Sequence, residues 1–226
     1  MKATLPTTTR AAVYENGGKV TVRDVPLAAP QRGELLVHVS ACGLCASEAL
    51  AWYADAKAPF VLGHEPVAVI VACGDDAKPD SGDAFRTGER VFVHHHAPCM
   101  TCRQCRRGDH VQCATWRRTK LRPGALAQFT VVPAENVLHD VLRVPDDLSD
   151  DKATLIEPLA TVVKSVRRSG LRAGDRVLII GLGAMGMLHA LVAGERGASL
   201  VIGADRVASR LDRAKEFGVT QTVDVG

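Results

Sequence analysis

Four cysteines lie close together in the sequence. Two residues separate the first from the second and the second from the third, and seven residues separate the third from the fourth. Thiolates at this spacing can surround one Zn²⁺ as a tetrahedral cage. A cage of four sulfur ligands leaves no open position for a substrate, so we expect a structural site in a lobe at about residues 95–115, formed by Cys99, Cys102, Cys105 and Cys113. Any reaction chemistry must then lie elsewhere in the chain.

A second group of possible metal ligands lies upstream. The segment 42–48 reads Cys-Gly-Leu-Cys-Ala-Ser-Glu, and the segment 63–65 reads Gly-His-Glu. Cysteine, histidine and carboxylate are the ligand types of zinc sites that keep one position open for a substrate. Each residue also has an ordinary explanation, because His64 could be a hydrogen-bonded loop histidine and Cys42 and Cys45 could be small buried thiols.

A glycine-rich turn follows an apolar run and precedes a predicted helix. In this context the pattern is typical of dinucleotide binding, because the glycines let backbone N–H groups approach a pyrophosphate at the helix N-terminus. The residues expected there are Gly181, Gly183, Ala184, Met185 and Gly186, followed by Asp205, Arg206 and Arg210 after the next strand. The Asp205 carboxylate favours NAD by binding ribose hydroxyls, whereas the neighbouring Arg206 could accept the extra phosphate of NADP. The alternative is a glycine-rich turn with a helix-capping aspartate.

Two kinds of secondary structure must position these residues. Short alternating apolar runs between turn residues predict strands at 11–14, 19–22, 34–39, 67–71, 90–93 and 126–132, with a hairpin turn at 16–18. From about residue 150 a helical pattern is followed by strand, helix, strand, helix and strand at 175–180, 184–196, 199–204, 207–217 and 220–225. We therefore predict an α/β fold with a mostly β catalytic domain over 1–150 and a parallel sheet over 151–226.

Three parallel strands are half of a six-stranded dinucleotide fold, so we expect a chain that is shortened at its C-terminal end.

The 226 residues include 28 basic and 25 acidic ones, and this balanced charge argues against nucleic-acid binding. No run of 18 apolar residues predicts a membrane span, and residues 1–10 lack the apolar core of a signal peptide. Seven cysteines without a secretion signal indicate a reducing, cytoplasmic location.

The order of these motifs resembles the zinc-containing medium-chain alcohol dehydrogenases over essentially the whole chain. The resemblance implies a GroES-like β domain followed by a Rossmann domain. It implies that Cys45 and His64 hold a catalytic zinc, with Glu65 a ligand beside them and Glu157 matching the remaining ligand position. A glutamate at 157 favours the polyol and threonine dehydrogenase branch, and Cys42 matches a position that is usually not a ligand.

The same resemblance implies that the Ser47 hydroxyl passes on the substrate proton and that Glu48 orients His64. Leu50 stands where some members carry a proton-relay histidine. Three histidines follow the predicted strand at 90–93, and strand alternation predicts that adjacent imidazoles point in different directions, so that one faces the cleft.

The implied function is zinc-dependent hydride transfer between NAD(P), with NAD favoured, and a secondary alcohol, polyol or amino alcohol, or the matching carbonyl compound. One catalytic and one structural zinc are expected, in a homodimer or homotetramer. Three alternatives stay open: a zinc-binding homologue without activity, a quinone-reductase-like enzyme without zinc, and a redox module that uses the cysteines as switches. The second predicts the loss of Cys45, His64 and the cysteine lobe, all of which are present.

Overall fold

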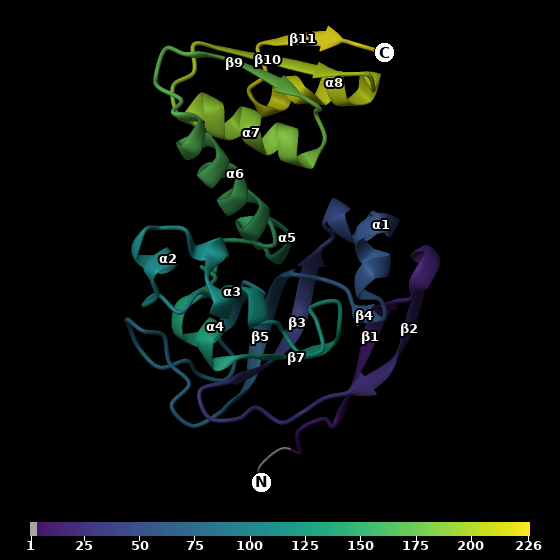
Figure 1. The fold of residues 1–226 in the computed structure, drawn as a ribbon, viewed down its shortest axis with the longest axis vertical. Coiled ribbons are helices and arrows are strands. Elements are labelled where there is room, and N and C mark those ends of the chain that lie inside the picture. Colours follow the sequence, from purple (N-terminus) through teal and green to yellow (C-terminus); the bar gives the residue numbers. More distant parts are fainter. Residues whose placement is uncertain (1–3) are drawn as a thin grey trace. The chain divides into compact units, whose positions relative to one another are not determined.

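The computed structural model describes residues 4–226, and the chain divides into two compact units, Met1–Ile156 and Glu157–Gly226. Figure 1 shows the β-rich first unit in purple to green and the second unit in green to yellow. Within residues 4–226, no helix has the length and apolar character that crossing a membrane requires.

The centre of the first unit is a five-stranded antiparallel sheet in the order β7-β3-β5-β6-β8. Its strands are β3 (Leu35–Gly43), β5 (Glu65–Cys73), β6 (Arg90–Val93), β7 (Phe129–Val132) and β8 (Val141–Arg143). Alternate residues of these strands point into one core, where Val37, Ile70 and Val91 are at most 1% exposed. The predicted ligands Cys45, His64 and Glu65 lie at or just beyond the ends of β3 and β5.

A second, smaller sheet has the order β2-β1-β4 and consists of β1 (Thr8–Tyr14), β2 (Val20–Pro26) and β4 (Phe60–Val61). The predicted hairpin is confirmed, because β1 and β2 pair antiparallel around the 3₁₀ turn η1 (Asn16–Gly18). The predicted strand at 126–132 is wrong in its first part. Residues 126–128 hydrogen-bond to β1, and β7 pairs with β3 only from Phe129 onward.

Short helices follow the strands of the first unit and carry many of the polar side chains. They are η2 (Ala46–Ala49), α1 (Ala51–Ala54), η3 (Asp55–Lys57), α2 (Arg103–Arg106), η4 (His110–Gln112), α3 (Ala114–Arg118), α4 (Ala134–His139) and α5 (Asp150–Ala153). Three of them, α2, η4 and α3, lie in the cysteine lobe. Because each has only one or two turns, their stability depends on the surrounding packing.

The second unit begins at Glu157, the second residue of α6 (Ile156–Ser169), and continues as a parallel sheet in the order β11-β10-β9. Its strands are β9 (Arg176–Ile180), β10 (Leu200–Asp205) and β11 (Gln221–Asp224), joined by α7 (Ala184–Glu195), α8 (Ala208–Ala214) and η5 (Lys215–Phe217). Both crossovers step in the same direction along the sheet, so α7 and α8 lie against the same face (Figure 1). The predicted β-α-β-α-β order is confirmed.

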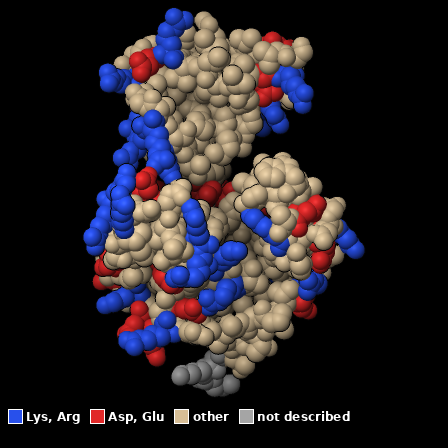
Figure 2. Space-filling view, viewed as in Figure 1, with Lys and Arg blue, Asp and Glu red and all other residues tan. Residues whose placement is uncertain are grey.

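Strand β9 is apolar on both faces, although it lies at the edge of its sheet. Ile179 packs into the core beneath α7, whereas Leu178 is 60% and Ile180 is 81% exposed. Figure 2 shows acidic and basic side chains on both units, with several of the basic ones gathered along the left edge of the view. The presence of both signs of charge agrees with the nearly balanced charge of the sequence.

Candidate metal centres and dinucleotide site

The pairing of β3 with β5 brings the upstream metal ligands together. Gly43 at the end of β3 lies opposite Glu65 at the start of β5, and a register shift between Val39 and Ala41 bends β3 just before this point. The loop that leaves β3 therefore lies beside the loop that enters β5. One donor atom each from Cys45, His64 and Glu65 lies within 4.8 Å of the other two.

Gly43 makes room for the carboxylate of this group. A Cβ atom at Gly43 would overlap the Glu65 carboxylate, so that carboxylate packs directly against the backbone of β3. Glu65 is only 6% exposed. Its position follows from the strand register and from the missing side chain at Gly43, neither of which can be recognised from the Gly-His-Glu motif.

Glu48 holds the imidazole of His64 from the side away from Glu65. Its Oε1 lies 3.4 Å from His64 Nδ1, and its two oxygens also accept hydrogen bonds from the backbone N–H groups of Gly63 and Cys45. His64 Nε2 lies 3.7 Å from Glu65 Oε1. Glu48 thus occupies one ring nitrogen and leaves the other toward the remaining ligand atoms, which is how a carboxylate orients a metal-binding histidine.

The electrostatics of this pair favour positive charge. Burial alone lowers the pKa of His64, but its interactions with Glu48 and Cys45 outweigh burial and raise the pKa to about 9. Burial alone raises the pKa of Glu48, yet hydrogen bonds from His64, Gly63 and Cys45 hold that pKa below its usual range. The thiol and the two carboxylates favour a positive charge at this place, and a metal cation bound to the neutral imidazole can supply that charge in place of the proton.

Ser47 lies between these donor atoms and a cavity. Its Oγ donates a hydrogen bond to Cys45 Sγ over 3.3 Å. The cavity has a volume of about 280 Å³, and its wall also includes Glu48, His64, Tyr53, Lys57, His95, His96 and Lys120. A hydroxyl next to a candidate metal ligand and facing a cavity can exchange a proton with a molecule bound there.

Two of the three consecutive histidines line this cavity, so the prediction that alternation separates adjacent imidazoles is wrong. The rings of His95 and His96 are 3.9 Å apart, and the His95 ring is 4.9 Å from that of His64. The reason is that β6 ends at Val93, beyond which the pleat no longer sets side-chain direction. Burial is the main cause that lowers the pKa of both residues, to about 4 for His96, so both rings are neutral at pH 7.

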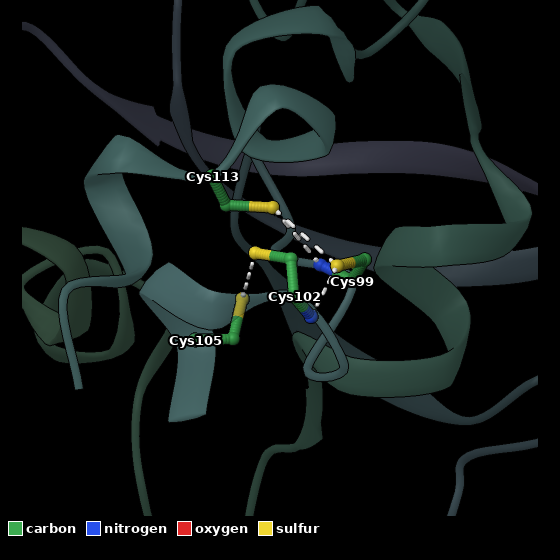
Figure 3. A group of neighbouring side chains, drawn as sticks. All are labelled: Cys99, Cys102, Cys105 and Cys113. Atoms are coloured by element: carbon green, nitrogen blue, oxygen red, sulfur yellow. Dashed lines mark hydrogen bonds between the residues drawn. The ribbon is translucent and has the colours of Figure 1, made fainter. Parts of the chain in front are cut away.

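The four cysteines of the lobe converge on one point (Figure 3). Their sulfur atoms all lie within 4.8 Å of one another, with Cys102 and Cys105 3.5 Å apart and Cys99 and Cys113 3.6 Å apart. Zinc–sulfur bonds of about 2.3 Å in a tetrahedron place the sulfurs roughly 3.8 Å apart, so the lobe fits one zinc ion. All seven cysteines of the chain are free thiols.

Backbone N–H groups of the lobe stabilise the thiolate form of its cysteines, which is the form that binds a metal. The N–H groups of Cys99 and Cys102 point at sulfur atoms of the group over 3.4 Å. Hydrogen bonds from Thr101, and then from the Cys102 N–H, lower the pKa of Cys99 to about 5. The Cys99 thiolate, which is the form that binds metal, is therefore present at neutral pH. By contrast, burial raises the pKa of Cys42 to about 12, and Cys42 packs against the core of the first unit.

The glycine-rich turn of the second unit joins β9 to α7. A Cβ atom at Gly186 would overlap the carbonyl oxygen of Gly181, so only glycine lets the first turn of α7 approach the turn this closely. Asp205 ends β10 and accepts hydrogen bonds from the N–H groups of Leu182 (2.7 Å) and Val207 (2.9 Å). These bonds lower the pKa of Asp205 and fix its carboxylate beside the turn.

The structure therefore brings Asp205 to the glycine-rich turn, together with Arg210, whose Nη1 lies 3.6 Å from the Asp205 carboxylate. Arg206 is exposed at the end of β10. Glu157 lies at the start of α6 and begins the second unit, where it is half-buried. Its assignment as a ligand stays a prediction.

The residues of the cavity wall that the sequence does not single out include three with polar groups, Tyr53, Lys57 and Lys120. No local signal marks them, because Lys57 in η3 and Lys120 after α3 are far apart in the sequence and line the same cavity only in the folded unit. An exposed lysine in a sequence indicates a solvated surface by default.

The known proteins that this chain resembles include dehydrogenases and a reductase. The chain is 30% identical to sorbitol dehydrogenase of Bacillus subtilis, over 100% of this chain and 64% of that protein. It is 32% identical to L-threonine 3-dehydrogenase of Alteromonas mediterranea, over 91% of this chain and 60% of that protein. The structure of acetophenone reductase from Geotrichum candidum in complex with NAD matches 98% of this chain and 65% of its own, with 27% identity and a TM-score of 0.83.

The chain thus spans just under two thirds of the length of these relatives. The family model of the alcohol dehydrogenase GroES-like domain matches residues 31–146, which is slightly more than half of the chain and includes both groups of candidate zinc ligands in the first unit. The chain therefore belongs to the zinc-type alcohol dehydrogenase family that carries this GroES-like domain.

Proposed function

We propose that the protein is a zinc-dependent dehydrogenase that transfers a hydride between an alcohol and a nicotinamide cofactor. The observation that carries this proposal is the convergence of Cys45, His64 and Glu65 within 4.8 Å beside a cavity lined by Ser47. Three ligands of different type next to open space are typical of a catalytic zinc rather than a structural one. Membership of the family supports the same reaction class.

Cys45, His64 and Glu65 would hold this zinc, with Glu157 proposed for the remaining protein position. When bound, zinc supplies a Lewis acid for the alcohol oxygen, and the nicotinamide supplies the hydride acceptor. Glu48 keeps His64 in the orientation that leaves Nε2 free for the metal. Ser47 then takes the proton from the substrate hydroxyl at its Oγ, 3.3 Å from Cys45 Sγ, and passes it on toward solvent.

We propose NAD as the preferred cofactor, bound at the glycine-rich turn. Asp205 is held by two backbone N–H groups at the end of β10, so its negative charge cannot easily move away from an incoming 2′-phosphate. The same carboxylate can accept hydrogen bonds from ribose hydroxyls. The four-cysteine lobe is proposed to hold a second, structural zinc, and assembly as a dimer or tetramer stays a prediction that light scattering can test.

The proposed activity can be tested with a matched pair of cysteine variants. The zinc-loaded protein should reduce NAD with at least one member of a panel of polyols, secondary alcohols and amino alcohols. Cys45→Ser should abolish that turnover, whereas Cys42→Ala, three residues away and outside the ligand group, should retain most of it. Full activity in Cys45→Ser would overturn the proposal, and zinc binding without turnover on any substrate would favour a non-catalytic homologue.

A further inference from the structure

Two lysines line the cavity that contains Ser47 and His64. Lys57 comes from η3, and Lys120 follows α3, so they reach the cavity wall from two segments that are well separated in the sequence. Neither residue belongs to the metal-ligand groups. Hydride transfer from a neutral alcohol needs no cation besides the metal. The reaction alone therefore does not explain why two lysines lie beside the candidate site.

The ammonium group of Lys57 has a defined position. Its Nζ lies 3.5 Å from the centroid of the Tyr53 ring, and that ring also lines the cavity. The negative face of an aromatic ring attracts an ammonium group electrostatically. In this position the ammonium group of Lys57 gives up part of its hydration, which a freely moving lysine would keep. Tyr53 thus keeps the charge of Lys57 at the cavity wall.

Carboxylates that could neutralise these lysines are engaged elsewhere. In the part of the chain that the structure describes, neither lysine forms an ion pair with a carboxylate. Glu48 is the one acidic residue of the described cavity wall, and its oxygens face His64 and two backbone N–H groups. Nearby Asp55 accepts hydrogen bonds from Tyr14 and Gly17. In the described part of the chain, the wall therefore presents two lysines whose ammonium groups form no ion pair with a carboxylate.

We propose that the alcohol substrate carries an anionic group, a carboxylate or a phosphate, which Lys57 and Lys120 bind while the hydroxyl lies at Ser47. This inference rests on the proposed dehydrogenase function and names the substrate class of the same site. Two cations facing a partly enclosed cavity concentrate anions there and strengthen hydrogen bonds to an anionic oxygen. The cavity volume of about 280 Å³ restricts the substrate to a small molecule.

Matched substrate pairs can separate the contribution of charge from that of the alcohol. The value of kcat/KM for NAD reduction by the zinc-loaded protein is measured for each compound. Glycerol 3-phosphate is then compared with glycerol, and 3-hydroxybutyrate with 2-butanol. We expect the anionic member of at least one pair to be preferred, and the pair that shows the preference distinguishes phosphate from carboxylate. The preference should shrink as ionic strength rises, because salt screens the lysine charges.

Lysine variants test whether these two residues cause the preference. Lys57→Gln and Lys120→Gln should each reduce the ratio of anionic to neutral kcat/KM by about tenfold, as expected for the loss of one charge-assisted hydrogen bond at a partly exposed site. Lys78→Gln removes another exposed lysine, one that does not line the cavity, and should leave the ratio unchanged. Equal ratios in the wild type and both cavity variants would overturn the inference.

A binding measurement keeps this result separate from the proposed function. If no alcohol in either pair is oxidised, the dehydrogenase proposal fails on those substrates, and the dissociation constants of glycerol 3-phosphate and 3-hydroxybutyrate are measured by calorimetry. Binding that is weakened by both cavity variants but not by Lys78→Gln supports the anion site. No binding of either anion to the zinc-loaded wild type contradicts it.

Discussion

The Glu48 carboxylate lies 3.4 Å from Nδ1 of His64, and both side chains are largely buried, with 7% and 18% of their surfaces exposed. This pair fixes the direction of the imidazole before any metal binds. Glu48→Gln should therefore lower zinc affinity at the Cys45 site by about 10- to 100-fold, because the amide no longer stabilises the oriented ring. Competition with a chromogenic chelator measures this loss, and unchanged affinity would show that His64 is oriented by other contacts.

Removing one ligand of the cysteine lobe should affect stability before chemistry. Cys102→Ser opens the cage and leaves the remaining thiolates without their metal, so the folded state loses the binding energy of the structural zinc. We expect Tm to fall by roughly 5–10 °C, which corresponds to about 2–3 kcal/mol for a protein of this size. Cys45→Ser is the matched variant and should lower turnover with a much smaller change in Tm. Equal loss of Tm in the two variants would contradict separate roles.

The close approach of α7 to the glycine-rich turn predicts opposite outcomes for two glycines of the same helix. Gly186→Ala places a Cβ atom against the Gly181 carbonyl, so α7 must shift and both Tm and NAD affinity should fall. Gly194→Ala adds a Cβ atom in open space within α7 and should stabilise the protein by up to about 1 kcal/mol. Thermal unfolding and NAD titration of both variants check this pair, and a neutral Gly186→Ala would contradict the observed packing.

Asp205 should control the choice between the two nicotinamide cofactors. Asp205→Ser removes the charge that repels a 2′-phosphate and leaves Arg206 beside it, so the ratio of NAD to NADP affinity should fall by about tenfold, or roughly 1.4 kcal/mol. Asp212→Ser removes an exposed acid of α8 and serves as the control. An unchanged ratio in Asp205→Ser would show that the ribose is recognised by other residues.

Features that are local in sequence could be predicted, and features that depend on tertiary contacts could not. The spacing of Cys99 to Cys113 and the glycine-rich turn before α7 encode their geometry within a few residues, and the structure gathers both as expected. The cavity wall is different, because Lys57 and Lys120 meet only after the sheet has formed. The end of β6 at Val93 agrees with the predicted strand, but the direction of His95 depends on the loop that follows, which strand alternation does not describe.

The sequence also did not predict which strands pair with one another or in which register. Residues 126–128 have the composition of a strand, yet they form hydrogen bonds with β1 and, through the Gln128 carbonyl, with Val39 of β3 instead of extending β7. The position of Glu65 depends on its register with Gly43, which alternation alone leaves undefined. Ligand types could thus be named in advance, while the contacts that orient them required the folded chain.

The zinc content of the purified protein tests the central claim most directly. Two zinc ions per chain are predicted for the wild type by elemental mass spectrometry, and one each for Cys45→Ser and Cys102→Ser, since each variant removes a ligand from a different group. A wild type that binds no zinc, or a Cys45→Ser variant that still binds two ions, would contradict the assignment of a catalytic and a structural centre.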